Sequence, residues 1–379
     1  KYRALTGLSR NKLERSIRDG FPFLPPGTQI VFDRVAQDIV LSNVKKQLKL
    51  STKDLVADVR QHKPDGAAPG DYALGSYLHA AERSLADVYG PGTRSMSGEK
   101  RSASWSTLVD WAFPADRGVE PSETADSLLR RVGTLTHVDD PERIQAYRRL
   151  LTSSTLAAGV ETDLYAAMLV YSFWPSGERT IRGGLDQLRS QPLVVGELLH
   201  LLDVQEQSSR VRPEALTGSV ARSPLRSHAR YSREELLAGL GLGTLDRGAP
   251  GAIREGVKWL PSMSVDALLV TLKKSEADYS PTTMYRDFAI NQDLFHWESQ
   301  STTSVESRTG QRYINHASRG SSVVLFVRRA KTGDIGTEPY TCLGTAQFQR
   351  ATGSRPMQIV WRLDRPMPAE LFMEARAVA

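Results

Sequence analysis

Cysteine is almost absent from this 379-residue sequence, which contains only Cys342. A single cysteine excludes an intramolecular disulfide framework and a cysteine-based zinc site, and it is typical of a reducing compartment, so we expect a cytoplasmic protein. No apolar run is long enough to span a bilayer, and no apolar stretch follows the basic N-terminal residues, so we expect neither a membrane partner nor a secretory signal. A chain that begins at Lys1 instead of methionine is expected to be a fragment.

The sequence also lacks the short motifs of several enzyme classes. It has no GxxxxGK[ST] for binding a nucleoside triphosphate, and neither HExxH nor paired Cys/His spacing for zinc. It has no GxSxG, and Cys342 shares a predicted strand face with Tyr340, Ala346 and Phe348, which indicates a buried, unreactive thiol. We therefore expect no cofactor in this chain, and no ATPase or covalent-hydrolase chemistry.

The excess of one charge sign is small, with 49 Lys and Arg against 43 Asp and Glu. The net charge of +6 favours a polyanionic partner, but many ordinary proteins are equally basic. With 40% hydrophobic and 24% charged residues, the chain is expected to be globular and to form two or three domains.

Helical periodicity dominates the first half of the sequence. The expected helices cover 74–88, 104–113, 122–132, 141–151, 161–173 and 193–204. Asp140 before Pro141 supplies an N-cap and a proline in the first turn. Residues 208–230 are rich in Ser, Pro and Arg and are predicted to be a linker. Ser232 and Glu235 then form a capping box that begins a short helix.

Strand patterns follow that helix. The expected strands cover 266–272, 295–300, 323–329, 340–350 and 357–364. In the last of these, Trp361 falls on the apolar side and is expected in the core. The predicted fold class is therefore α+β, with an α-helical N-terminal region followed by a β-rich, barrel-like C-terminal domain. The expected divisions are 1–60, an α-helical domain at 61–207, the linker at 208–230 and a β-rich domain at 231–379.

One strand near residue 300 combines aromatic and hydrogen-bonding side chains. Because side chains alternate along a strand, Phe295 and Trp297 are expected to face the core. The opposite face then carries His296, Glu298 and Gln300. A solvated surface without a partner explains the same composition equally well.

A glycine-containing turn around Gly310 is expected to follow this strand and to present two guanidinium groups beside its polar face. The side chains presented there would be Arg308, Gln311 and Arg312. Arginine and glutamine are residue types that contact phosphates and base edges, so this turn is a candidate nucleic-acid contact.

Asp287 and Glu298 form a weaker, catalytic candidate. Together with Gln300, they resemble the acidic residues and the E-x-Q pair of metal-dependent nucleases, in which two carboxylates hold Mg²⁺. The pattern is short and arises often by chance. His296 and His316 are likewise expected to be structural, hydrogen-bonded histidines and not general bases.

Several longer segments carry a resemblance to a known family. They include His228 with Tyr231, REG (254–256), TTMYRD (282–287), LFHWESQ (294–300), TGQRY (309–313), LFVR (325–328), LG (343–344) and RPM (355–357). With these segments, residues 225–372 resemble a bacterial family of unknown function at the C-terminal end of superfamily-two (DEAD/DEAH-type) helicases, often behind a phospholipase-D-like nuclease domain. The opening segments 2–7, 20–27 and 41–43 resemble the stretch directly after the second motor domain of these helicases, so 1–60 is expected to be a post-motor segment.

The resemblance implies the post-motor part of a DNA-processing helicase, of the kind associated with restriction and phage defence. ATP and Mg²⁺ would then belong to an upstream motor of the same polypeptide, and nuclease residues would also lie upstream. The polar strand, the glycine turn and the LFVRR strand are also similar to small β-barrels that read modified bases in methylation-dependent restriction enzymes.

We therefore expect a DNA-binding accessory module of a superfamily-two helicase, with DNA and the upstream motor as its partners. The expected DNA contacts are His296, Gln300, Arg308, Gln311, Arg312, Arg328 and Lys331. Two alternatives stay open: a metal-dependent nuclease that uses Asp287 and Glu298, and a protein-docking module that recruits other defence components.

Overall fold

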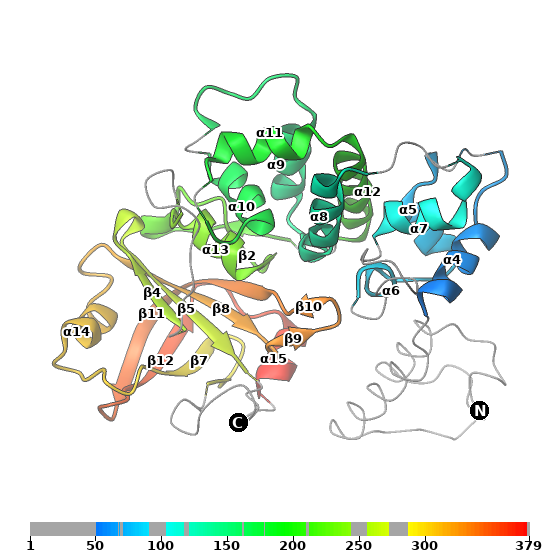
Figure 1. The fold of residues 1–379 in the computed structure, drawn as a ribbon. Coiled ribbons are helices and arrows are strands. Elements are labelled where there is room, and N and C mark those ends of the chain that lie inside the picture. Colours follow the sequence, from blue (N-terminus) through cyan, green and yellow to red (C-terminus); the bar gives the residue numbers. More distant parts are fainter. Residues whose placement is uncertain are drawn as a thin grey trace, which may run out of the picture. The chain divides into compact units, whose positions relative to one another are not determined.

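The computed structural model describes residues 51–66, 68, 71–90, 104–116, 121–160, 163–177, 179–209, 212–243, 256–272 and 287–376. Most of the expected post-motor segment and residues 282–286 of the family pattern lie outside these ranges. The chain divides into two compact units, Lys1–Gly133 and Thr134–Ala379, whose elements are labelled in Figure 1.

The first unit is helical where it is described. Its helices are α4 (Thr52–Gln61), α5 (Leu74–Ala80), α6 (Leu85–Tyr89), α7 (Trp105–Ala112) and α8 (Glu123–Val132), with a 3₁₀ turn η2 (Pro114–Asp116). The apolar stripe at 74–88 forms two helices instead of one, because Glu82 takes a left-handed backbone with φ of 52° between them. Trp105 lies in the core, where its ring stacks on Tyr77 at 5.1 Å and its indole N–H donates to the carbonyl of Tyr72 at 3.0 Å.

The second unit begins with a helical layer. It contains α9 (Pro141–Thr152), α10 (Leu164–Phe173), α11 (Ile181–Arg189) and α12 (Pro192–Ser208), after the 3₁₀ turn η3 (Gly133–Leu135). The predicted cap of α9 is confirmed, since the Asp140 carboxylate accepts the N–H of Glu142 at 3.0 Å. Within the described ranges, no helix has both the length and the apolar composition of a membrane span.

A mixed sheet forms the other layer of this unit (Figure 1). Its order is β4-β5-β8-β11-β12-β7-β6, with β3 paired to β11. These strands are β3 (Arg230–Tyr231), β4 (Val257–Leu260), β5 (Val265–Thr271), β6 (Phe288–Ala289), β7 (Leu294–Glu298), β8 (Ser322–Arg328), β11 (Tyr340–Thr352) and β12 (Gln358–Leu363). The sheet is open, with β4 and β6 at its ends, which corrects the barrel-like architecture expected from the strand pattern. Among the described strand pairs, β5 with β8 alone is parallel.

Shorter elements complete the unit. They are β1 (Glu214–Ala215), η5 (Gly218–Val220), β2 (Arg226–Ser227), α13 (Arg233–Gly239), η6 (Pro261–Met263), α14 (Arg308–Ile314), β9 (Thr332–Gly333), β10 (Gly336–Thr337) and α15 (Ala369–Arg376). Helix α14 lies at one end of the sheet, and the β9–β10 hairpin lies at the other (Figure 1).

The core on one side of the sheet matches the sequence-based expectation. Trp361 is fully buried, with its ring 6.5 Å from Trp297 and 6.4 Å from Tyr313. Cys342 is also fully buried, and burial raises the pKa of its thiol to about 12, so the predicted inert cysteine is confirmed. Phe295 lies in the same core.

A buried charged cluster joins α13 to α9. Glu235, from the predicted and confirmed capping box, accepts hydrogen bonds from Arg143 Nη1 at 3.1 Å and from the Tyr147 hydroxyl at 2.8 Å. His137 Nε2 contacts the other carboxylate oxygen. Burial by itself raises the pKa of Glu235, but the attraction to His137 and Arg143 outweighs burial and holds this pKa at about 2. The ionised carboxylate therefore fixes the helical layer to the chain that enters the sheet.

Residues 212–231 are packed on the sheet layer, although their composition predicts a linker. Strands β1 and β2 pair with each other, and β3 pairs with β11 through Tyr231 and Tyr340. Leu216, Val220 and Leu225 are buried. This segment therefore differs from an exposed connection, because its apolar side chains are buried, it forms two short ladders and it belongs to the second unit. The domain divisions themselves stay a prediction.

Candidate nucleic-acid interface

Alternation along β12 creates the surface from which the candidate site is built. Ile359, Trp361 and Leu363 are buried in the core, whereas Gln358 and Arg362 are exposed. Because successive side chains of a strand point to opposite faces, the sheet here has a polar side opposite its core.

The register of the neighbouring strands extends this surface. Cross-strand partners share a face, and the pairs are Gln347 with Arg362, Thr352 with Gln358, Arg350 with Val360, Val360 with His296, and Gln358 with Glu298. We call the resulting surface the polar sheet face. It is defined by Gln347, Arg350, Thr352, Gln358, Arg362, His296 and Glu298.

A β-bulge directs one of its arginines. The register shifts between Phe348 and Arg350, so Gln349 is the extra residue of β11. Such an insertion reverses the alternation that follows it. Phe348 pairs with buried Trp361, and Arg350 therefore joins the polar sheet face two residues later instead of pointing into the core.

Four exposed guanidinium groups lie on this face or at its end. Arg350 and Arg362 belong to the face itself. Arg355 lies in the turn between β11 and β12, where its N–H donates to the carbonyl of Thr303 at 3.1 Å. Arg308 follows shortly after Thr303 in the chain, as the first residue of α14. Within the part of the chain that the structure describes, none of the four forms an ion pair, so their charges are available to an anion.

Two residues expected as DNA contacts belong to this region. The ring of His296 stacks on Phe288, with the centroids 4.6 Å apart and the planes at 15°. His296 lies on the face as predicted, while Phe295 and Trp297 are buried behind it. Arg308 is exposed at the same end of the sheet as the β11–β12 turn.

The expected turn around Gly310 is wrong, because the residues form α14. Ser307 caps the helix by accepting the N–H of Gly310 at 3.0 Å. A Cβ on Gly310 would lie 2.0 Å from the carbonyl oxygen of Ser304, so glycine serves close packing and not a turn. Gln311 consequently points back and donates to the carbonyl of Val305 at 2.9 Å.

Arg312 is held by an internal partner. Its Nε and Nη2 atoms donate to the two carboxylate oxygens of Asp266 at 2.6 and 2.8 Å, and Asp266 is fully buried. The guanidinium also lies 4.5 Å from the ring of Trp259. A bidentate pair to a buried carboxylate uses the donors that a phosphate would need. Gln300 is also engaged, accepting from the Thr303 hydroxyl at 3.2 Å.

The remaining expected contacts lie away from the polar sheet face. Arg328 ends β8, donates to Thr271 Oγ1 at 2.9 Å and lies 4.5 Å from the ring of Tyr340. Lys331 is exposed at the start of the β9–β10 hairpin, where its carbonyl accepts the N–H of Glu338 at 3.1 Å. The structure therefore divides the predicted set between the two ends of the sheet.

The two carboxylates of the nuclease alternative are used within the fold. Asp287 is buried and its Oδ1 accepts the backbone N–H of Glu298 at 3.0 Å. Glu298 Oε1 accepts from Gln358 Nε2 at 3.4 Å. Across the described residues, no group of three or more His, Cys, Asp or Glu side chains is placed to hold a metal ion.

A polar pocket of about 370 Å³ adjoins the polar sheet face. It forms where β8 begins, so that β11 continues without β8 beside it. There His316 replaces the missing strand: its Nε2 accepts the N–H of Phe348 at 3.2 Å, and its Nδ1 donates to the carbonyl of Ser321 at 3.2 Å. Burial lowers the pKa of His316, which favours this neutral ring. The expected structural role of His316 is confirmed.

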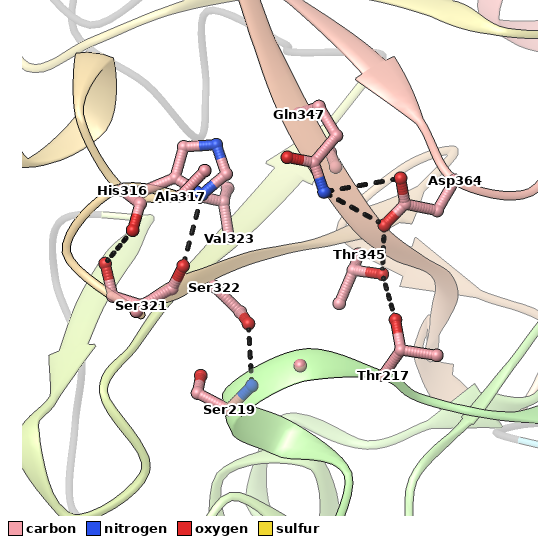
Figure 2. A pocket seen from close by; sticks show the side chains of 13 residues that line it. Thr217, Ser219, His316, Ala317, Ser321, Ser322, Val323, Thr345, Gln347 and Asp364 are labelled. Atoms are coloured by element: carbon pink, nitrogen blue, oxygen red, sulfur yellow. Dashed lines mark hydrogen bonds between the residues drawn. The ribbon is translucent and has the colours of Figure 1, made fainter.

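Figure 2 shows two sides of the pocket. His316, Ala317 and Ser321 form one side, and Thr217, Thr345, Gln347 and Asp364 form the other. On the second side, the Asp364 carboxylate accepts from Thr345 Oγ1 at 2.6 Å and from Gln347 Nε2 at 3.3 Å.

The arginines and glutamines of β11 and β12 were not among the site residues predicted from the sequence. The alternation of polar residues with Ile359, Trp361 and Leu363 was a sufficient signal for the face of β12. The bulge that directs Arg350 and the assembly of the pocket from four separate segments have no such signal.

The C-terminal part of the chain matches one known family. Residues 225–375, less than half of the chain, match a domain of unknown function (DUF3427). DUF3427 is commonly found in helicase-associated proteins, and the match shows no helicase family for this chain. No curated protein matches the sequence.

Proposed function

We propose that the chain is a DNA-binding accessory module of a superfamily-two helicase acting in restriction, phage defence or DNA processing, and that it contacts DNA through the polar sheet face. The observation that carries this proposal is the placement of Arg350 and Arg362, without ion pairs among the described residues, on an open face with amide and hydroxyl side chains. The match of residues 225–375 to a domain common in helicase-associated proteins supports the same reading.

The two arginines would bind phosphates, with Arg355 and Arg308 extending the positive charge at the end of the sheet. Guanidinium groups bind phosphate oxygens through paired N–H donors, and they set orientation without reading sequence. Gln358 and His296 are side chains of the type that contacts base edges, and Gln358 would exchange its 3.4 Å hydrogen bonds with Glu298 and Thr352 for such a contact. Discrimination among sequences or modified bases would come from those side chains.

Salt-dependent DNA binding tests the proposal. We expect the wild-type chain to bind duplex DNA, and Arg350→Ala with Arg362→Ala to weaken binding at low salt. Each lost phosphate contact should reduce the slope of log K against log[salt] by about 0.9. Arg149→Ala, which removes an exposed arginine from α9, is the matched control.

Melting temperatures of all variants show whether the fold is kept. If Arg350→Ala and Arg362→Ala bind as tightly as Arg149→Ala, the polar sheet face is a solvated surface and DNA is bound elsewhere or not at all. Comparison of unmodified and methylated duplexes then shows whether Gln358→Ala changes affinity for one of them only.

A further inference from the structure

The pocket and the polar sheet face share Gln347. On β11 this residue pairs with Arg362, and its side chain also lines the pocket. A polymer whose phosphate is held at Arg362 would therefore place its next groups at the pocket opening.

The described lining of the pocket is polar and contains no Lys or Arg. Its hydroxyl groups come from Thr217, Ser219, Ser321, Ser322 and Thr345, and among the described lining residues Asp364 alone carries a carboxylate. The neutral ring of His316 already uses both nitrogen atoms. A phosphate would meet a carboxylate without a compensating cation, so the lining disfavours anions.

Among the described residues, two hydrogen-bonding groups in the pocket keep capacity for a ligand. Ser322 Oγ accepts the N–H of Ser219 at 3.1 Å, and among the described residues its hydroxyl hydrogen meets no acceptor. The amide of Gln347 donates to Asp364, which leaves its carbonyl oxygen as an acceptor. In Figure 2 that oxygen points away from Asp364.

Backbone forms the wall beside this hydroxyl. Gly218 has φ of 68°, and a Cβ there would lie 2.8 Å from Ser322 Oγ. The close approach keeps Ser322 and η5 together. The donor at Ser322 is therefore held in a fixed position.

We propose that this pocket receives one uncharged nucleoside unit of the bound DNA, recognised by hydrogen bonds to its base edge. The inference rests on the proposed function, because it assigns the pocket to the DNA held at the polar sheet face. A base displaced from a stack exposes its own donors and acceptors, and these match a hydroxyl donor and an amide acceptor. The described lining has no Phe, Tyr or Trp, and the ring of His316 is fixed by hydrogen bonds at both nitrogen atoms, so we assign recognition to hydrogen bonds instead of stacking.

Free nucleosides test the pocket without DNA. Deoxyadenosine, deoxyguanosine, deoxycytidine, thymidine and their ribonucleoside counterparts are titrated into the whole chain, with inorganic phosphate in parallel. We expect saturable binding of at least one nucleoside and none of phosphate. Equal binding of deoxy and ribo forms supports recognition of the base, whereas binding of ribonucleosides alone would overturn the assignment of this pocket to DNA.

A matched pair of substitutions locates the binding. Ala317→Phe places a ring at the pocket side, whereas Ser318→Phe places the same ring on the exposed neighbouring residue, which does not line the pocket. We expect nucleoside binding to be lost in the first and kept in the second. The smaller change Ser322→Ala should weaken binding by about threefold to tenfold, as expected for one hydrogen bond.

The outcomes separate this inference from the proposed function. No nucleoside binding by the wild type, or binding that survives Ala317→Phe in a folded protein, overturns the pocket assignment even if DNA binding depends on Arg350 and Arg362. Pocket-dependent nucleoside binding supports the assignment even if those arginines prove neutral for DNA.

Discussion

Availability of a side chain, more than its type, decides which arginines of this protein can meet a ligand. In the sequence, nothing distinguishes Arg312 from Arg350: each is an arginine in a polar segment close to an aromatic residue. In the structure, Arg312 is bound in two places to Asp266, while Arg350 has no ion pair in the described ranges. The partner that distinguishes them lies 46 residues away from Arg312.

Arg312→Ala should therefore reduce stability. It would leave the fully buried carboxylate of Asp266 without its cation, which costs about 3–5 kcal/mol in comparable pairs. Urea denaturation measures the change. Arg308→Ala, on the exposed first residue of the same helix, should stay within about 0.5 kcal/mol of wild type. Equal stability of both variants would show that the Asp266 pair contributes little.

The residue-level site was predictable only in part. Alternation placed Phe295 and Trp297 in the core and His296 and Glu298 opposite them, because period two is a property of any strand. It could not show that Asp266 neutralises Arg312 or that Thr271 holds Arg328, since both partners come from a strand distant in sequence. The polar residues that remain available were found from the sheet register.

At the scale of elements, α14 shows how packing overrides a turn signal. Glycine in a polar segment predicts a turn, yet Gly310 lies in a helix against the carbonyl of Ser304. The sequence has no marker that separates a glycine needed for φ from one needed for close approach. Five strands of the sheet, β5, β7, β8, β11 and β12, were predicted from the sequence, whereas β3, β4 and β6 were not, and the expected closure into a barrel is not found.

The sign of the stability change in Gly310→Ala shows whether Gly310 serves close packing or only lowers the helix propensity of α14. Helix propensity alone would make the variant about 1 kcal/mol more stable. The Cβ position 2.0 Å from Ser304 O instead predicts destabilisation of about 1–3 kcal/mol through overpacking. Thermal or urea unfolding gives the sign. A stabilised variant would contradict the close approach, and Thr309→Ala on the preceding helical residue serves as the control.

The link between α9 and α13 should depend on pH through Glu235. Its pKa is about 2 in the folded protein and 4.5 in an unperturbed carboxyl, so its stabilising contribution is present above pH 4.5 and is lost as pH falls towards 2. Glu235→Gln should be less stable than wild type at pH 6.5, and the gap should narrow at pH 3.5. The midpoints of urea denaturation at both pH values measure this difference in stability between Glu235→Gln and the wild type.

Glu206→Gln is the reference for that comparison. Glu206 forms an exposed pair with Arg148, with 47% of its side chain accessible, so its substitution should change stability little at either pH. A gap for Glu235→Gln that stays constant between pH 6.5 and 3.5 would mean that the carboxylate does not provide the link.

At the scale of the whole molecule, the segment 212–231 decides how the chain is divided. Its composition predicts a linker, whereas its ladders and buried leucines attach it to the second unit. Limited trypsin digestion should spare Arg222 and Arg226 until the sheet unfolds, because local opening is needed for cleavage. Mass spectrometry of early fragments checks this. Early cuts at these two residues would restore the linker interpretation.

The pairing of β3 with β11 also constrains the order in which the protein can fold during synthesis. Arg230 is made about 110 residues before its partner Thr341. At typical rates of synthesis, the segment waits about 5–20 s for that partner to emerge. The helices α9 to α12 are complete throughout this interval, but the charged end of α13 is not yet anchored to a finished sheet. Until Tyr340 and Thr341 have been made, the backbone groups of β3 that pair with them in the finished sheet have no strand beside them.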